Sequence, residues 1–163
     1  MGAVYNPPQE QIQFLQDYDL QHVDLALGSD DFVEGEIVGE DQNGNAVKLS
    51  VGTTITHPKI CRTGTDRQDV KESGKITTAR GKGRIKTRVY AASQTWPADG
   101  EIVVKSDGAG AGLGKGNLYP LASGDVAAAD YLALGRVVTP PSTDGDWLVL
   151  DLYADPKLVT KAE

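Results

Sequence analysis

A row of five cations at every second position constrains the fold of this chain more than any other feature. The row lies in the segment KITTARGKGRIKTRVY, residues 75–90, and consists of Arg80, Lys82, Arg84, Lys86 and Arg88. A period of two is the side-chain period of a β-strand, so we predict a strand with a basic face and a face that packs on a core. The five charges would span about 26 Å. Two strands broken near residues 80–83 are the alternative to a single one.

Short β-branched and apolar runs, separated by turn signals, fill most of the remaining chain. Asn43-Gly44 suits a type I′ turn, which predicts a hairpin between the runs on either side. In the last run, Leu148, Leu150 and Leu152 alternate with other residues and should face the core. The pattern predicts an all-β fold, a small β-barrel or sandwich of short antiparallel strands. Besides the basic segment, we expect strands over 32–38, 46–51, 53–61, 101–105, 118–121, 131–138 and 146–152.

The connecting segments carry fewer signals. Residues 62–69 read as a polar loop, and residues 125–130 could form one helical turn. Trp96 should cap the core from its loop, and Cys61 should be a small core residue. Asp155-Pro156 is expected to end the fold, because proline cannot donate to a sheet.

The length suits one domain with an arm, since domains cluster near 100–150 residues. We divide the chain into an N-terminal arm (1–31), a β-rich domain (32–155) and a C-terminal tail (156–163). In the arm, Pro7-Pro8 favours an extended entry. The residues after it allow either a short helix, with Ile12 and Leu15 at helical spacing, or an extended segment. The arm would dock either on its own chain or on a neighbouring subunit, because so short a segment is not stable alone.

Charge is distributed unevenly along the sequence. The net charge is −7, with −9 in residues 1–50, +6 in residues 51–100 and −4 in residues 101–163. A general nucleic-acid binder should be basic overall, and this chain is acidic. The uneven distribution instead favours contacts between complementary patches, within the chain or with another protein.

The sequence offers no recognisable catalytic, metal or nucleotide site. His22, His57 and Cys61 are too scattered to supply a structural zinc site. The glycine-rich stretch 106–116 lacks the spacing of a P-loop, and no nucleophile motif occurs. We therefore expect no enzyme activity, no cofactor and no metal. A single cysteine excludes an internal disulfide and suits assembly in a reducing cytoplasm. Neither a membrane span nor a signal peptide is expected.

Several segments appear in an order that resembles the head decoration (cement) and capsid-associated proteins of tailed bacteriophages. The resemblance covers roughly residues 30–152 and concerns pattern and strand order. The segments are Gly35-Glu-Ile-Val, Gly44-Asn-Ala-Val-Lys48, Thr65-Asp-Arg-Gln-Asp-Val70, Gly74-Lys-Ile-Thr-Thr78, Thr87-Arg-Val-Tyr90 and the closing pair Gly135-Arg-Val-Val and Trp147-Leu-Val-Leu.

The resemblance implies a β-rich subunit that binds the outside of the assembled capsid and clamps neighbouring capsid proteins. Its partners would be the major capsid protein and other copies of itself, as a trimer rather than a dimer. It would be found in the virion, after assembly in the host cytoplasm. The residues expected at these interfaces are the five cations of the row and, in the arm, Tyr5, Pro7, Pro8 and Phe14.

Two other functions remain open at this stage. The basic strand could follow a nucleic-acid backbone, as small β-barrels can, although no aromatic residues are interleaved in the row. The chain could also be an enzyme without recognisable motifs.

Overall fold

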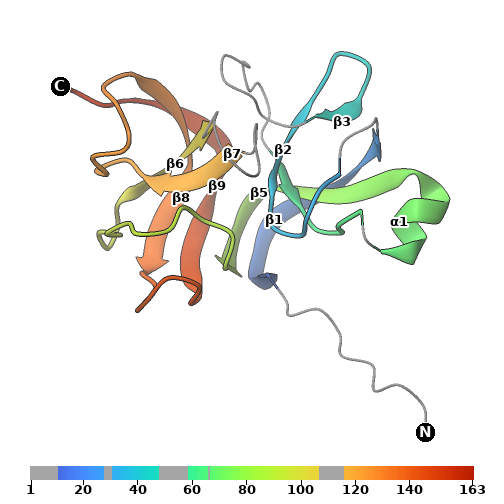
Figure 1. Ribbon diagram of the computed structural model, residues 1–163, viewed down its shortest axis with the longest axis horizontal. Coiled ribbons are helices and arrows are strands. Elements are labelled where there is room, and N and C mark those ends of the chain that lie inside the picture. Colours follow the sequence, from blue (N-terminus) through green and yellow to red (C-terminus); the bar gives the residue numbers. More distant parts are fainter. Residues whose placement is uncertain (1–10, 28–30, 48–58, 66, 107–115) are drawn as a thin grey trace, which may run out of the picture.

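The computed structural model describes residues 11–27, 31–47, 59–65, 67–106 and 116–163. Over these residues the chain forms a predominantly β structure with one short helix (Figure 1), which confirms the all-β prediction. The elements are β1 (Ile12–Leu27), β2 (Ile37–Glu40), β3 (Asn45–Val47), β4 (Lys59–Cys61), α1 (Gln68–Ser73), β5 (Lys75–Thr87), β6 (Glu101–Ser106), β7 (Gly116–Pro120), β8 (Asp130–Thr139) and β9 (Leu148–Thr160).

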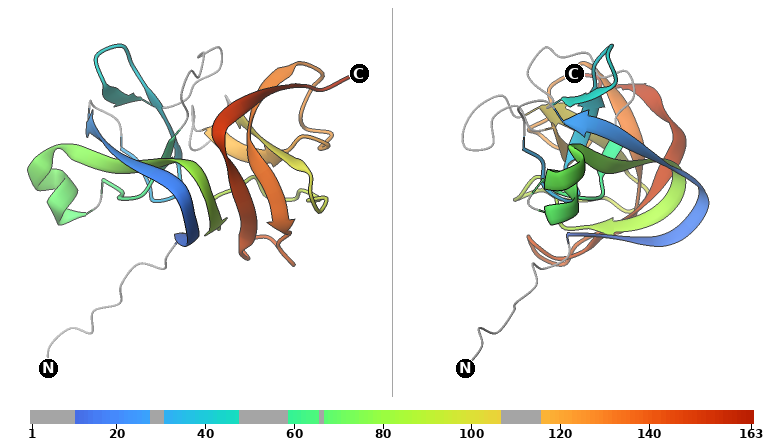
Figure 2. Two further views of the ribbon diagram at one scale, coloured as in Figure 1. Left: turned by 180° about the vertical axis from the view of Figure 1, so that it is seen from behind. Right: turned by 90° about the vertical axis from the view of Figure 1, so that its right-hand side faces the viewer.

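All nine strands belong to one sheet, which closes on itself. Its order is β1-β3-β2-β4-β5-β9-β8-β6-β7, and further pairings join β1 to β5 and β2 to β7. These pairings produce a smaller ring (β1, β3, β2, β4, β5) and a larger ring (β2, β4, β5, β9, β8, β6, β7) that share three strands. Neighbouring strands are antiparallel except β1 and β3, which are parallel. The two rings form the two lobes seen in Figures 1 and 2.

Each ring encloses its own apolar core. The larger core includes Ile85, Trp96 and the three leucines of β9, as predicted for these residues. The smaller core includes Leu25 and Cys61. A third cluster packs on the opposite face of β6, β7 and β8.

The shared strands β2 and β4 are buried on both faces. Ile37 and Ile60 belong to the larger core, while their neighbours Val38 and Cys61 belong to the smaller one. Successive side chains of a strand point to opposite faces, so a strand between two cores must be apolar on both sides. This explains why short runs of consecutive residues are buried in β2 and β4.

β1 belongs to the sheet over residues 12–27. It pairs antiparallel with β5 along almost its whole length, and its residues Ile12 and Leu25 are buried. Of the alternatives for this segment, the extended conformation on its own chain is therefore correct, and the helical spacing of Ile12 and Leu15 forms no helix. Pairing with β5 provides hydrogen bonds for the backbone of β1, which a lone arm would lack. Residues 1–10 lie outside the described residues.

β5 is one continuous strand, so the possible break near residues 80–83 does not occur. Gly81 lets the strand bend without ending, with φ of 103°. A Cβ atom at Gly81 would lie 2.4 Å from the carbonyl oxygen of Asp19 on β1. Only glycine allows the two backbones to approach so closely at this conformation.

The predicted hairpin is present as β2 and β3, where Gly39 pairs with Val47. The predicted type I′ turn is wrong, because Gly44 has a positive φ of 80° and Asn43 does not. The carboxylate of Asp41 accepts hydrogen bonds from the backbone N–H groups of Asn43 and Asn45 at 2.8 and 2.9 Å. The turn is therefore stabilised by the side chain of Asp41, whose carboxylate accepts hydrogen bonds from the backbone of the residues that follow it.

Three expectations about the connecting segments and the end of the fold are wrong. β9 continues past Pro156 and pairs with β8 as far as Thr160. Its pairing with β5 stops at Leu152, and Pro156 lies in the irregularity of the β8–β9 register between the pairs Gly135–Leu152 and Ala133–Lys157, where proline breaks no ladder pairing. Part of the predicted polar loop 62–69 instead begins α1, which ends at Gly74 with φ of 67°. The predicted helical turn at 125–130 is absent, and β8 starts at Asp130.

Candidate interaction surface

The basic row lies on the outward face of β5, between β1 and β9. The views in Figure 2 show β1 and β5 running side by side around one lobe, in agreement with their pairing. β9 pairs with the other edge of β5 from Gly83 to Thr87. We call the side chains gathered here the outer strip. They are Tyr18 of β1, Arg80, Lys82, Arg84 and Lys86 of β5, Arg88 just after β5, Trp147 just before β9, and Asp151 in the first part of β9.

The centre of the outer strip is an ion pair between adjacent strands. Arg84 and Asp151 are direct partners in the β5–β9 register. The Nε and Nη2 atoms of Arg84 donate to the two carboxylate oxygens of Asp151 at 2.8 and 3.1 Å. This fork geometry is the one arginine favours with carboxylates. Hydrogen bonding to Arg84 holds the pKa of Asp151 below its ordinary value and raises the pKa of Arg84.

One half of the strip faces acidic β1. Arg80 donates to the side-chain oxygen of Gln21 at 3.2 Å, and Lys82 is paired in register with Asp19. The ammonium of Lys82 lies 6.0 Å from the centre of the Tyr18 ring. The sheet register shifts beside Tyr18, as expected for a β-bulge that turns a side chain outward, and the residue is 55% exposed.

The other half surrounds one tryptophan. The ammonium of Lys86 lies 4.5 Å from the centre of the Trp147 ring, and the guanidinium carbon of Arg88 lies 4.3 Å from it. Both distances fit cation–π contacts. The Nε atom of Arg88 is covered and has no hydrogen-bond partner among the described residues. Stacking on Trp147 therefore holds this guanidinium in place.

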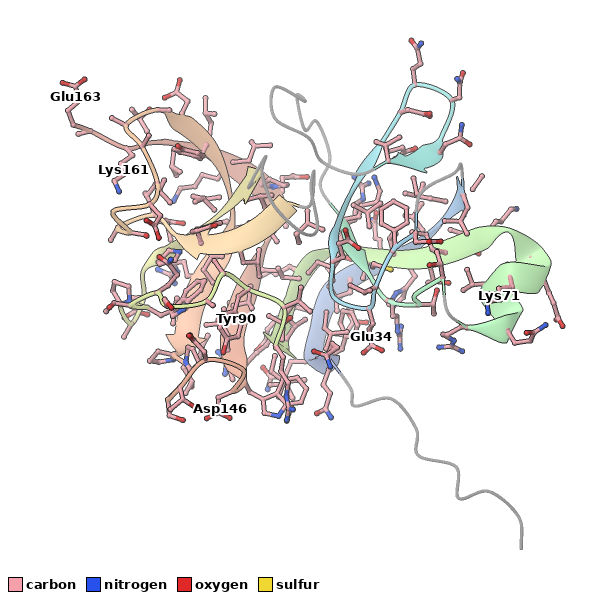
Figure 3. All side chains as sticks on the ribbon, viewed as in Figure 1. Glu34, Lys71, Tyr90, Asp146, Lys161 and Glu163 are labelled. Atoms are coloured by element: carbon pink, nitrogen blue, oxygen red, sulfur yellow. The ribbon has the colours of Figure 1, made fainter. Side chains whose placement is uncertain are left out.

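Carboxylates compensate much of the positive charge of the row. Asp151 pairs with Arg84, Asp19 lies beside Lys82, and Arg88 contributes to the lowered pKa of Asp146, after hydrogen bonds from Ser142 and the Trp147 N–H. Asp146 lies in the loop that leads into β9 (Figure 3). A surface that follows a phosphate backbone needs a run of uncompensated cations. Protein–protein hot spots instead typically combine tyrosine, tryptophan and arginine with charged side chains that are paired to one another.

Sequence reasoning found the cations but missed the aromatic residues beside them. Tyr18 and Trp147 come from β1 and β9, far from residues 80–88 in sequence. Trp147 could have been found, because it alternates with the core-facing leucines of β9 and must point away from the core. Tyr18 gave no such signal, because its outward position depends on a bulge.

The predicted arm residues are not part of this surface as described. Tyr5, Pro7 and Pro8 lie outside the described residues. Phe14 is half-buried and packs against the larger core. The guanidinium carbon of Arg62 lies 5.0 Å from the centre of its ring. The structure therefore places Phe14 inward rather than among the exposed residues of the strip.

A small polar pocket lies where β5 changes partners. An opening of 170 Å³ lies among residues of β1, β5 and β9, beside the stretch of β5 between its pairing with β4 at Ala79 and its pairing with β9 at Gly83. Among the described residues, no three histidine, cysteine or acidic side chains come together in a way that could hold a metal ion. The pocket is lined by Asp19, Gln21, Arg80, Gly81, Ala154 and Asp155.

The Arg84–Asp151 pair should make stability depend on pH. Because the folded-state pKa of Asp151 is lowered, the pair contributes stability above the ordinary aspartate pKa of about 4 and loses it as pH falls through the folded value. Arg84→Gln should therefore destabilise the protein at pH 7 more than at pH 3. Urea unfolding at both values measures the difference.

Arg67→Gln is the matched control for this prediction. Arg67 pairs with Asp69, with both side chains more than half exposed, so its removal should change stability little at either pH. An Arg84→Gln penalty that is equal at pH 3 and pH 7 would contradict a stabilising role of the ionised pair.

Neither a comparison with models of protein families nor one with curated protein sequences finds a match for this chain. Among the described residues, no helix has the length and apolar character needed to cross a membrane.

Proposed function

We propose that this chain is a structural virion protein that binds the outer surface of an assembled phage capsid and stabilises it by clamping neighbouring capsid subunits. The outer strip is the contact surface in this proposal. Its support is the gathering of Tyr18, Trp147 and the arginines of the row on three paired strands. The paired strands fix these side chains in place before a partner binds, which reduces the conformational entropy lost on binding. The phage and capsid part of the proposal comes from the sequence resemblance.

The strip alone is too small for a lasting complex. About 26 Å of length and three strands spaced by about 5 Å give roughly 400 Å² of surface. A stable interface needs about 800 Å² from each partner. Binding through several linked copies would supply the difference, because a second contact within one assembly costs far less than the first. Self-association is therefore part of the proposal, and the trimeric state comes from the sequence resemblance.

The test is co-sedimentation of the purified protein with expanded capsids of the phage that encodes it. We expect the protein to sediment with the capsids and to run as an oligomer in analytical ultracentrifugation without them. Capsids that lack the protein should rupture at lower temperature than capsids that carry it. A monomer that ignores capsids, yet binds single-stranded DNA with a steep salt dependence, would favour the nucleic-acid function instead.

A further inference from the structure

The Lys86–Arg88–Trp147 end of the outer strip differs from the rest in its electrostatics. We call these three residues the Trp147 cluster. Arg84 is paired with Asp151, and Arg80 donates to Gln21. Within the part of the chain that the structure describes, the side-chain nitrogens of Lys82, Lys86 and Arg88 make no ion pair within 4.0 Å and no hydrogen bond. Lys86 and Arg88 differ from Lys82 because they share one aromatic ring, and the carboxylate of Asp146 acts on Arg88 from farther away.

Both cations of the cluster are held by the same ring. Lys86 lies 4.5 Å and Arg88 4.3 Å from the ring centre of Trp147. The ring is fixed at the start of β9, where the backbone N–H of Trp147 donates to the carboxylate of Asp146 at 3.2 Å. The backbone N–H of Arg88 donates to the carbonyl oxygen of Gln11 at 2.8 Å. Two positive charges are thus positioned next to each other, and neither is in an ion pair within 4.0 Å with another described residue, so little side-chain entropy is lost when an anion binds.

We propose that the Trp147 cluster is the anchor of the outer strip and binds an acidic segment of the partner protein. Adjacent carboxylates on an extended partner segment would meet Lys86 and the outer N–H groups of Arg88, and the segment's side chains would cover Trp147. This proposal rests on the proposed function, because it specifies which partner chemistry the contact surface accepts.

An acidic protein segment fits this site better than a nucleic-acid strand. A strand would have to continue along the row, past the carboxylates of Asp151 and Asp19, and like charges repel it there. A short acidic segment needs only the two cations that share the Trp147 ring. Tryptophan and arginine together, with charged pairs around them, are also the composition of protein-binding hot spots.

The first experiment uses hexaglutamate as the probe and tryptophan fluorescence as the readout. The chain has two tryptophans, and Trp96 is only 6% exposed, so a change on binding should come from Trp147. Lys86→Gln with Arg88→Gln should weaken binding about tenfold or more at low salt. Arg80→Gln with Lys82→Gln removes the same charge from the same strand and should weaken it less than about twofold. Arg88→Lys keeps the charge but loses the fork and should give an intermediate value.

Two results would overturn the assignment. Equal losses in both double variants would show attraction to net charge rather than a specific anchor. Tighter binding of a thymidine hexanucleotide than of hexaglutamate would show a site for phosphates. The thermal midpoint of each variant is measured first, and the single substitution Lys86→Gln replaces the double variant if that one does not fold.

Co-sedimentation separates this inference from the proposed function. If the variants change hexaglutamate affinity as expected but the protein does not co-sediment with capsids, the assignment of the Trp147 cluster is supported and the capsid function is wrong. If the Lys86→Gln, Arg88→Gln variant still binds capsids as the unmodified chain does, the capsid function stands and the anchor is wrong.

Discussion

Gly135→Ala is expected to lower the free energy of unfolding by about 3 kcal/mol or more, at the upper end of the cost of overpacking. A Cβ atom at Gly135 would lie 2.2 Å from the carbonyl oxygen of Asp151 and 3.0 Å from its carbonyl carbon. The obstacle is the backbone of β9, which cannot move aside as a flexible side chain could. β8 is also paired with β6 through Gly135 and Ile102, so the strand has no free side toward which to shift.

Urea unfolding followed by circular dichroism measures this loss. Gly124→Ala is the control, because a Cβ atom at Gly124 meets no atom within 4 Å. We expect the control to change the free energy of unfolding by less than about 1 kcal/mol. A loss at Gly135 as small as that of the control would mean that β8 and β9 can separate there without cost, and that their close approach does not hold the larger ring together.

Alternating patterns in the sequence were sufficient to predict the long strands that border the larger core. Leu148, Leu150 and Leu152 face that core, and Ile85 lies on the packed side of β5, as the period of two indicates. Trp96 is buried and its ring packs edge-on against Tyr90. In each case one buried face gives a clear local signal that a single stretch of sequence contains.

Features that depend on distant partners could not be predicted in the same way. β1 ends at Leu27 and β5 begins only at Lys75, and their register includes two irregularities. Those irregularities place Tyr18 outside, so its position follows from the pairing and not from local alternation. The helix α1 buries only Val70, which leaves no apolar periodicity to detect.

The uneven charge of the sequence has a largely internal explanation. The acidic strand β1 lies beside the basic strand β5, and Asp17 and Asp19 are paired in register with Gly83 and Lys82. Opposite charges on neighbouring strands stabilise their pairing. The contrast between the first and second thirds of the chain is therefore not by itself an indication of an external partner. That indication rests on the Trp147 cluster, where neither cation makes an ion pair within 4.0 Å among the described residues.

Glu40→Ala is expected to lower the free energy of unfolding by about 2–3 kcal/mol, whereas Lys59→Met should change it by less than about 1 kcal/mol. Lys59 is only 3% exposed, and its ammonium lies 2.7 Å from a carboxylate oxygen of Glu40, which is 34% exposed. Loss of Glu40 leaves a covered positive charge without this carboxylate. Loss of Lys59 leaves a carboxylate that water can still reach, and methionine fills the space with an apolar chain.

The unequal effect of the two substitutions is the test, and urea unfolding at neutral pH measures it. Lys59 lies on the same face of β4 as Cys61, two residues on, which belongs to the smaller core. Methionine at position 59 would therefore extend the apolar surface of that core. The double variant Glu40→Ala, Lys59→Met should recover most of the stability that Glu40→Ala alone loses, because no buried charge remains. Equal losses for the two single variants, without recovery in the double variant, would mean that the ion pair itself stabilises the ring and that burial of Lys59 carries little cost.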